Sequence, residues 1–135
     1  MIMVMKVEYV PHCDLFVAQT KGPVDFDEAR ELERAVMDSD HFRPGAKILR
    51  LLAEADFDPR GIHAFARWMV HEYGERFPKI AYVAPDPPSA ALAYLLKQGV
   101  GDGDIAVFST GAAAVDWLDV DSDHCPLEEL PVDLP

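Results

Sequence analysis

A single α/β domain with a mixed, mostly parallel sheet is the fold that this sequence predicts, and three observations support it. Short runs rich in β-branched and aromatic residues recur along the chain, and segments with apolar residues at helical spacing separate most of them. The clearest stretch, 79–118, predicts strand, helix, strand and helix in succession. The 135 residues suit one domain, and half of them are hydrophobic, which favours a packed core.

The first elements are expected to be a hairpin and a helix. Runs 4–10 and 15–20 are β-rich and flank a turn-like segment, so they predict two antiparallel strands, the second of which ends at 21–23. Asp25 opens a helix-capping pattern, and apolar residues then recur on one helical face. That pattern predicts a helix that ends near Asp38.

The rest of the chain alternates strands with helices, which gives the order ββαβαβαβα. Three further strands are expected at 46–52, 79–83 and 104–108. The core of the first of these is apolar except for Arg50, which is typical of a central strand. Helices are expected to begin at Asp58, at Ser89 or a neighbour, and at 109–111. Right-handed helical crossovers then make the sheet parallel after its opening hairpin, with the helices packed on it.

Residues 119–135 differ in composition from the rest of the chain. They contain three prolines and six acidic residues, which leaves too few apolar groups to predict another core element. We therefore expect a domain at 1–118 and an acidic, proline-containing C-terminal tail at 119–135, which lies over the domain or a neighbouring subunit.

Composition limits the kinds of partner that the protein is expected to bind and the compartment in which it is expected to lie. The formal net charge of −12 repels phosphate backbones, so nucleic acid is not an expected partner. No run reaches membrane-spanning length, and the apolar first five residues lack the features of a signal peptide, so no membrane insertion is expected. Two cysteines without an export signal predict free thiols in a reducing compartment, and the expected location is the cytoplasm.

Several of these segments resemble the SpoIIAA-like group of small STAS-type domains, which is loosely grouped with the lipid-binding Sec14 class. The resemblance covers 4–118 and rests on 22–25 with its helix, on 48–52 leading to Asp56, on 79–84, and on 107–110 followed by 114–118. It implies a STAS/SpoIIAA-like fold. Anti-sigma-factor antagonists of this type carry a phosphorylated serine where the third strand meets the next helix. Here that junction, 56–61, has no hydroxyl group, so the resemblance does not carry over a kinase-regulated switch.

A rim for a ligand or partner is predicted at the carboxyl ends of the parallel strands, where open α/β sheets bind ligands. Its residues are Asp56, Phe57, Asp58, Arg60, Asp86, Ser89 and Ser109. Carboxylates gathered at one rim bind cations or raise one another's pKa. Each aspartate also precedes or opens a helix, and helix capping is the interpretation that we favour.

Two His-Cys dipeptides offer a further hypothesis, at 12–13 and 124–125. They would supply four soft ligands to a metal if the hairpin turn and the tail met, which the sequence leaves open. Adjacent ligands usually point apart, and structural zinc ligands are usually spaced by two to four residues, so no metal or cofactor is expected. His71-Glu72 begins like a zinc-protease helix but lacks the second histidine one turn later.

Two functions from different classes follow. The first is a non-catalytic interaction module that contacts a protein partner or itself, and an edge strand beginning at 1–4 makes a homodimer plausible. The alternative is a carrier of a small apolar ligand or lipid, based on the Sec14 resemblance and on the stripe Phe65, Trp68 and Met69. An enzyme that uses the acidic rim is disfavoured, because no nucleophile and base are paired in the sequence.

Overall fold

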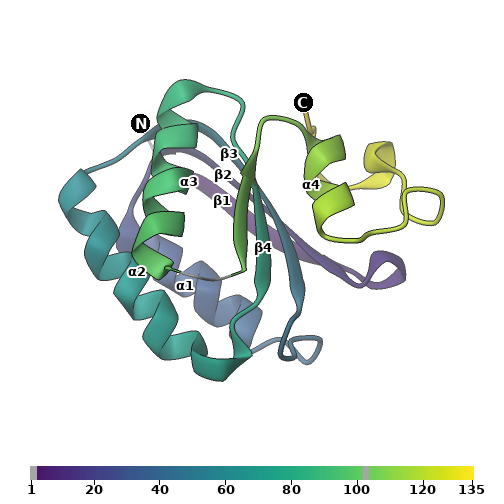
Figure 1. Ribbon diagram of the computed structural model, residues 1–135, viewed down its shortest axis with the longest axis horizontal. Helices are drawn as coiled ribbons and strands as arrows, with labels where there is room; N and C mark the ends of the chain where they lie inside the picture. Colours follow the sequence, from purple (N-terminus) through teal and green to yellow (C-terminus); the bar gives the residue numbers. More distant parts are fainter. Residues whose placement is uncertain (1–2, 102–103) are drawn as a thin grey trace.

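A twisted five-stranded sheet with helices on both faces forms the protein (Figure 1). The computed structural model describes residues 3–101 and 104–135. In chain order the elements are β1 (Val4–Val10), β2 (Leu15–Pro23), α1 (Phe26–Met37), β3 (Lys47–Asp56), α2 (Pro59–Tyr73), β4 (Lys79–Val83), α3 (Pro87–Val100), β5 (Ile105–Phe108) and α4 (Gly111–Trp117). Short 3-10 helices lie at Pro11–Cys13, Gly74–Arg76 and Leu127–Glu129.

The strands follow one another across the sheet in the order β1-β2-β3-β4-β5. β1 pairs with β2 antiparallel, and every later pair of neighbours is parallel. This arrangement confirms the predicted hairpin, the predicted parallel strands and the order ββαβαβαβα. Each parallel strand lies beside the strand that precedes it in the chain, and each crossover between them is right-handed. The helices of these crossovers, α1, α2 and α3, therefore lie on the same side of the sheet.

Side chains on the helix N-termini explain where the helices begin. The carboxylates of Asp25 and Asp58 accept hydrogen bonds from backbone amides in the first turns of α1 and α2, as predicted. The third helix begins earlier than expected. Asp86, not Ser89, caps it, because two prolines follow Asp86 and proline is tolerated at the first helical positions. In α4, the hydroxyl of Thr110 accepts the capping bond.

Two strands are longer than the sequence predicts. β2 continues through Pro23, and β3 continues through Asp56, where 21–23 and 53–56 were expected to be loops. The parallel pairing of these strands goes on through a register irregularity between Lys21 and Pro23, and the amide of Val24 donates to the carbonyl of Asp56 at 2.7 Å. Pairing with a neighbouring strand therefore overrides the local turn signal of glycine and proline.

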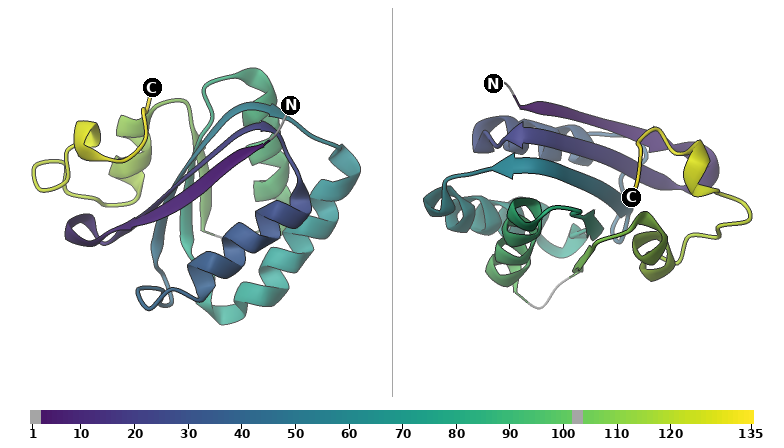
Figure 2. Two further views of the ribbon diagram at one scale, coloured as in Figure 1. Left: turned by 180° about the vertical axis from the view of Figure 1, so that it is seen from behind. Right: turned by 90° about the horizontal axis from the view of Figure 1, so that it is seen from above.

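Successive side chains of a strand point to opposite faces of the sheet, and the core accordingly has two parts. The helix face is covered by α1, α2 and α3; its buried residues include Phe16, Ile48, Ile80 and Tyr82 of the strands and Leu32, Phe65, Met69 and Leu92 of the helices. The tail face is covered by α4 and residues 119–135; its buried residues include Leu15, Val17, Leu49, Ala81, Val115, Leu118, Cys125 and Leu130. Figure 2 shows these two layers on either side of the strands.

Residues 119–135 lie against the sheet and contribute to its core. Cys125 and Leu130 are buried, with 2% and 6% of their surfaces exposed, and four more apolar residues of this stretch pack against them. No α-helix or strand forms in this stretch, and it lies over the domain as expected, but single side chains without regular structure still enter the core. The division of the chain at 118 stays a prediction.

Membrane insertion was not expected from the sequence. Over the described residues, no helix has the length and apolar character needed to cross a bilayer.

Candidate functional site

The predicted rim residues occupy the ends of β3, β4 and β5, and the hydrogen bonds among them in the described residues join only Asp58 with Arg60 and Asp86 with Ser89. Asp58 caps α2 and pairs with Arg60, and both side chains are largely exposed. Asp56 and Ser109 are exposed, and Phe57 is half-buried against the core of the helix face. The capping interpretation is confirmed for Asp58. The rim as a ligand or partner surface stays a prediction.

Asp86 and Ser89 connect the start of α3 to the end of β3. One carboxylate oxygen of Asp86 accepts from the amide of Ser89, and the other accepts from the amide of Glu54, both at 2.9 Å. The buried hydroxyl of Ser89 accepts from the amide of Ala55 at 3.1 Å. These bonds fix two elements to each other, so both side chains have structural roles.

The electrostatics of the rim differ from those of an acidic catalytic site. The Arg60 guanidinium lowers the pKa of Asp58. Partial burial alone would raise the pKa of Asp86, but hydrogen bonds from Glu54 and Ser89 bring that pKa below its usual range. Carboxylates that acted on one another would have raised pKa values instead. Asp58 and Asp86 are therefore separate carboxylates, each stabilised in its ionised form by its own partners.

An apolar cavity of about 40 Å³ lies under α1, on the helix face of the sheet. Its walls are Met5, Val24, Phe26, Ala29, Leu32, Leu52, Phe65, Leu92 and Leu96, together with Thr20, Glu33, Arg50 and Tyr82. Phe65 belongs to the aromatic stripe of α2. The ring of Trp68 in the same stripe stacks on Phe65 at a centroid distance of 5.9 Å, and Met69 is fully buried. The stripe is therefore part of the core, and only Phe65 of the three reaches the cavity.

Arg50 and Glu33 form a buried ion pair in the wall of this cavity. The two guanidinium Nη atoms of Arg50 lie 2.5 and 2.6 Å from the two carboxylate oxygens of Glu33, and both side chains are almost wholly shielded from solvent. The hydroxyl of Tyr73 donates to the same carboxylate, and Nη1 of Arg50 donates to the hydroxyl of Tyr82 at 3.3 Å. Nε of Arg50 is buried and has no partner within the described part of the chain.

The positive charge of Arg50 and the hydroxyl protons of the two tyrosines are held by their surroundings. Burial would lower the pKa of Arg50, but the Glu33 carboxylate outweighs burial and holds that pKa well above its usual value. Burial raises the pKa of Tyr73, and the same carboxylate raises it further. Burial also raises the pKa of Tyr82. Arg50 therefore keeps its positive charge, and the two tyrosines keep their hydroxyl protons.

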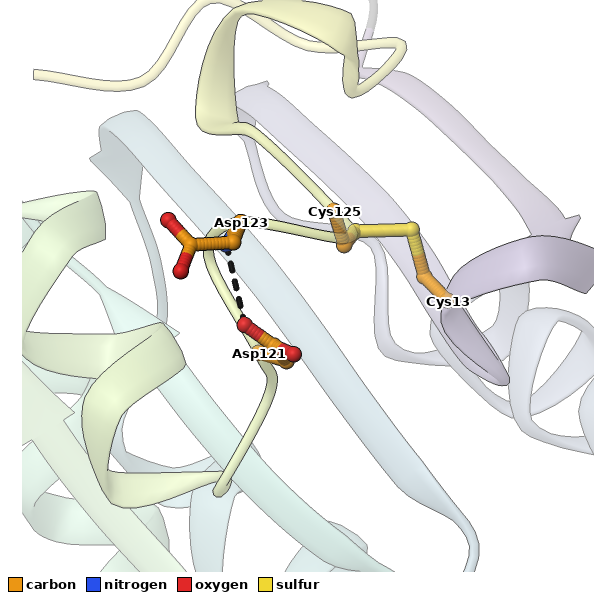
Figure 3. Close-up of a disulfide and its surroundings, with 4 residues drawn as sticks. All are labelled: Cys13, Asp121, Asp123 and Cys125. Atoms are coloured by element: carbon orange, nitrogen blue, oxygen red, sulfur yellow. Dashed lines mark hydrogen bonds between the residues drawn. A yellow bond between two sulfur atoms is a disulfide. The ribbon is translucent and has the colours of Figure 1, made fainter.

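A second cluster forms where the hairpin turn meets the tail. Cys13 and Cys125 are joined by a disulfide, with their Cα atoms 5.5 Å apart (Figure 3). The expectation of free thiols is wrong, because the fold brings together two cysteines that lie 112 positions apart in the sequence. A location in the cytoplasm stays a prediction, and the cysteines no longer support it.

Local hydrogen bonds hold the turn that carries Cys13 and the loop that carries Cys125 in place. Pro11 begins the 3-10 turn that carries Cys13, and Asp14 closes it in the left-handed region at φ 49°. The carboxylate of Asp14 is held by the hydroxyl of Tyr9 and by the guanidinium of Arg43. On the tail, the side chain and carbonyl of Asp121 accept from the amides of Asp123, His124 and Cys125, which forms the loop that Figure 3 shows.

The two His-Cys dipeptides therefore do meet. A ring nitrogen of His12 and the sulfurs of Cys13 and Cys125 lie within 4.8 Å of one another. The imidazole of His124 lies edge-on to that of His12, with ring centroids 6.2 Å apart. In the described residues this is the only group of three or more possible metal ligands that come so close.

The sequence held partial signals for these clusters. A single arginine inside an otherwise apolar central strand marks Arg50 as a buried charge that needs a partner. Its partner, Glu33, lies on another element, and only the packing of α1 on the sheet identifies it. The two His-Cys dipeptides are visible in the sequence as motifs, but no local sequence pattern shows that they are neighbours in the fold.

Comparisons with known proteins give a fold and no activity. No family model matches the chain, and no curated protein matches it. A crystal structure of an uncharacterised protein from Shewanella loihica PV-4 is similar, and it is described as a member of the DUF3478 family with a SpoIIAA-like fold. The two chains are 13% identical and superpose with a TM-score of 0.59 over 86% of this chain and 93% of the other. The chain described here therefore has the SpoIIAA-like fold that the sequence resemblance implied.

Proposed function

We propose that this protein is a non-catalytic binding module, and that the cavity over Arg50 takes a small apolar ligand that carries one hydrogen-bond acceptor. The observations behind this proposal are the buried Nε of Arg50, which has no partner in the described residues, and the apolar cavity that the Arg50 side chain helps to line. A buried N–H without a partner costs about 1–3 kcal/mol, and an acceptor atom placed in the cavity would recover that cost.

The charges of the cavity define the chemical class of the ligand. Glu33 already neutralises Arg50 through two short contacts, so an anionic ligand would bring a second negative charge close to Glu33. A neutral carbonyl or ether oxygen supplies the missing acceptor without that repulsion. The remaining walls are mostly aliphatic and aromatic, which suits a short hydrocarbon group.

The volume of the cavity limits the ligand. A space of roughly 10–15 Å³ on the same measure holds one water molecule, so about 40 Å³ accommodates only a few non-hydrogen atoms. A lipid chain does not fit into the cavity as it stands. Lipid carriage is thus less well supported than a small ligand such as a short ketone.

The experiment is a titration of the ¹⁵N-labelled protein with acetone, 2-butanone and 2-hexanone, observed by the backbone amide shifts. We expect saturable shifts for residues around the cavity, with affinity rising along the series until the chain no longer fits. Native mass spectrometry of the freshly purified protein provides a second readout, because a ligand retained from the cell adds a fixed mass.

A pair of variants on α1 tests the location of binding. Ala29→Leu fills the cavity from α1, one turn before Glu33, without removing any polar group, and it is expected to abolish the ketone shifts. Ala35→Leu adds the same atoms on the exposed side of the same helix and is the control. If none of the ketones gives saturable shifts, or if both variants bind as the wild type does, the proposed function is wrong and a buried water satisfies Nε.

Self-association through β1 is a second candidate function, and it has its own observation. β1 is an edge strand with no further strand beside it in the described sheet, and Val4 is 56% exposed. An antiparallel pairing of two copies centred on Val7 places Lys6 opposite Glu8 twice. Opposite charges in directly facing positions stabilise a strand pair by about 0.2–1 kcal/mol each.

Charge reversal tests this dimer. Lys6→Glu and Glu8→Lys each place like charges opposite one another, so each variant is expected to weaken dimerisation in sedimentation experiments, and the double swap is expected to restore it. A wild-type protein that sediments as a monomer at high micromolar concentration contradicts the dimer without affecting the ligand proposal.

A further inference from the structure

We propose that reduction of the Cys13–Cys125 disulfide turns this cluster into a tetrahedral Zn²⁺ site with ligands His12, Cys13, His124 and Cys125. The site is distinct from the cavity over Arg50, since the cluster lies on the tail face and the cavity on the helix face. Its failure or success is therefore independent of the proposed function.

Three of the four proposed ligand atoms already lie about as close together as a tetrahedral metal requires. In a tetrahedral site with Zn–S bonds of about 2.3 Å, two sulfurs are about 3.8 Å apart. The ring nitrogen of His12 and both sulfurs already lie within 4.8 Å of one another. Two imidazoles on one zinc have ring centroids about 5 Å apart. The observed distance between the His12 and His124 rings is 6.2 Å, so His124, which lies outside the group of three, must turn toward the sulfurs to become the fourth ligand.

The donor set is chemically selective. Two thiolates and two imidazoles form a common structural zinc site, whereas magnesium and calcium prefer oxygen ligands. Cys125 is buried and Cys13 is half-buried, so the sulfurs are shielded on one side, while both histidines are exposed and able to turn. The tail loop around Cys125 contains no helix or strand, so the sulfurs can separate without loss of regular structure.

Disulfide and metal exclude each other at this place. A dithiol reductant attacks one sulfur of the bridge, forms a mixed disulfide, and then leaves as a cyclic disulfide, which transfers two electrons and two protons to Cys13 and Cys125. Zn²⁺ then binds both sulfurs as thiolates and releases those two protons. An oxidant of the disulfide class reverses the sequence and expels the zinc.

Either state fastens the tail to the hairpin turn. The disulfide does so under oxidising conditions, and the zinc site does so under reducing conditions. In the reduced protein without metal, residues 119–135 are held only by their packing and by hydrogen bonds such as those to Lys6, Lys47 and Gly111.

Cobalt provides the direct test, because Co²⁺ replaces Zn²⁺ and gives strong visible absorption when thiolates bind it in a tetrahedron. The full chain, free of any histidine tag, is treated with a phosphine reductant or left oxidised, and each form is titrated with Co²⁺. We expect one thiolate-bound Co²⁺ per chain in the reduced form and none in the oxidised form. Added Zn²⁺ is expected to displace the cobalt.

Variants test which histidines bind. His12→Ala and His124→Ala are each expected to weaken Co²⁺ binding at least 10-fold to 100-fold, since loss of even a supporting residue of a metal site has this effect. His63→Ala and His71→Ala remove exposed histidines of α2 and are the matched controls, with no expected change. Cys13→Ser is expected to abolish the thiolate absorption.

A second measurement keeps the test decisive if reduction loosens the fold. Limited proteolysis of the reduced chain is expected to cut 119–135 without metal and to spare it with Zn²⁺. The proposal is overturned if the reduced chain shows no thiolate absorption with Co²⁺, if the two histidine variants bind as tightly as their controls, or if Zn²⁺ leaves the proteolysis of the tail unchanged.

Discussion

The two faces of the sheet are covered by different kinds of structure. On the helix face lie three helices of 12, 15 and 14 residues, each with its apolar side toward the strands. On the tail face lie α4, which has seven residues, and the stretch 119–135, which has only one short 3-10 helix. The helix face also contains the buried ion pair, and the tail face contains the disulfide.

This difference follows from the order of the strands. Right-handed crossovers between successive neighbours deliver every connecting helix to the same side, and they leave the other side of an apolar sheet uncovered. α4 follows the last strand and is free to cross over. It is too short to cover the face alone, so an irregular segment completes the layer and a covalent bond holds that segment in place.

The largest expected effect comes from breaking the ion pair of the helix face. Glu33→Ala leaves the Arg50 charge buried and uncompensated, and we expect the free energy of unfolding to fall by about 3–5 kcal/mol in urea denaturation. Glu31→Ala removes an exposed pair with Arg34 on the same helix and is expected to cost at most about 1 kcal/mol. Equal losses for both variants would show that the buried pair is not the stronger support.

The disulfide is the corresponding support of the tail face. Cys13→Ser, measured under oxidising conditions with a metal chelator, is expected to lower the free energy of unfolding by about 2–4 kcal/mol, because the bridge closes a very long loop. Hydrogen exchange is expected to accelerate in 119–135 while the amides of α2 keep their protection. Uniform acceleration in both regions would contradict a separate role for the tail.

A matched pair of leucines compares packing on the two faces. Leu32 of α1 and Leu130 of the tail are 7% and 6% exposed. We expect Leu32→Ala to cost about 4 kcal/mol and Leu130→Ala about 2 kcal/mol, because an irregular segment collapses into the space more easily than a helix does. Thermal unfolding of both variants under one buffer checks the difference, and a cost for Leu130→Ala equal to that for Leu32→Ala would mean that the tail is packed as rigidly as α1.

The smallest effect is expected at the rim. Asp86→Ala removes the cap of α3 and is expected to cost about 1 kcal/mol at neutral pH. Since the folded pKa of Asp86 lies below its ordinary value of 3.8, its contribution is present above that value and is lost as the pH falls toward the folded pKa. The difference in stability between wild type and Asp86→Ala should therefore shrink in acid. A difference that is constant from pH 7 to pH 3 would exclude a role for the ionised carboxylate.

The helix face was predictable from the sequence to a large extent. Asp25 and Asp58 mark the starts of α1 and α2 by local chemistry, and the apolar run 79–83 has the bounds of β4. Helical periodicity and capping are local properties, so a sequence displays them directly. The lengths of β2 and β3 were underestimated, because pairing between strands decided where they end.

The tail face and the candidate sites were much less predictable. Residues 119–135 have no periodicity, so composition alone predicted a tail over the domain or a neighbour, without showing which of its side chains are buried. The contact of Cys13 with Cys125 and that of Glu33 with Arg50 join elements that are distant in the sequence. Such contacts depend on how the strands and helices pack together. A sequence motif shows only which residues could take part in them.

The disulfide also has a consequence for how damage to the chain would be detected. The bridge encloses most of the molecule in one covalent ring, from the first turn to the segment after α4. A protease that cuts once anywhere inside this ring leaves both pieces joined, so the nicked protein keeps its mass apart from one added water. It migrates as two fragments only after a thiol reagent has opened the ring.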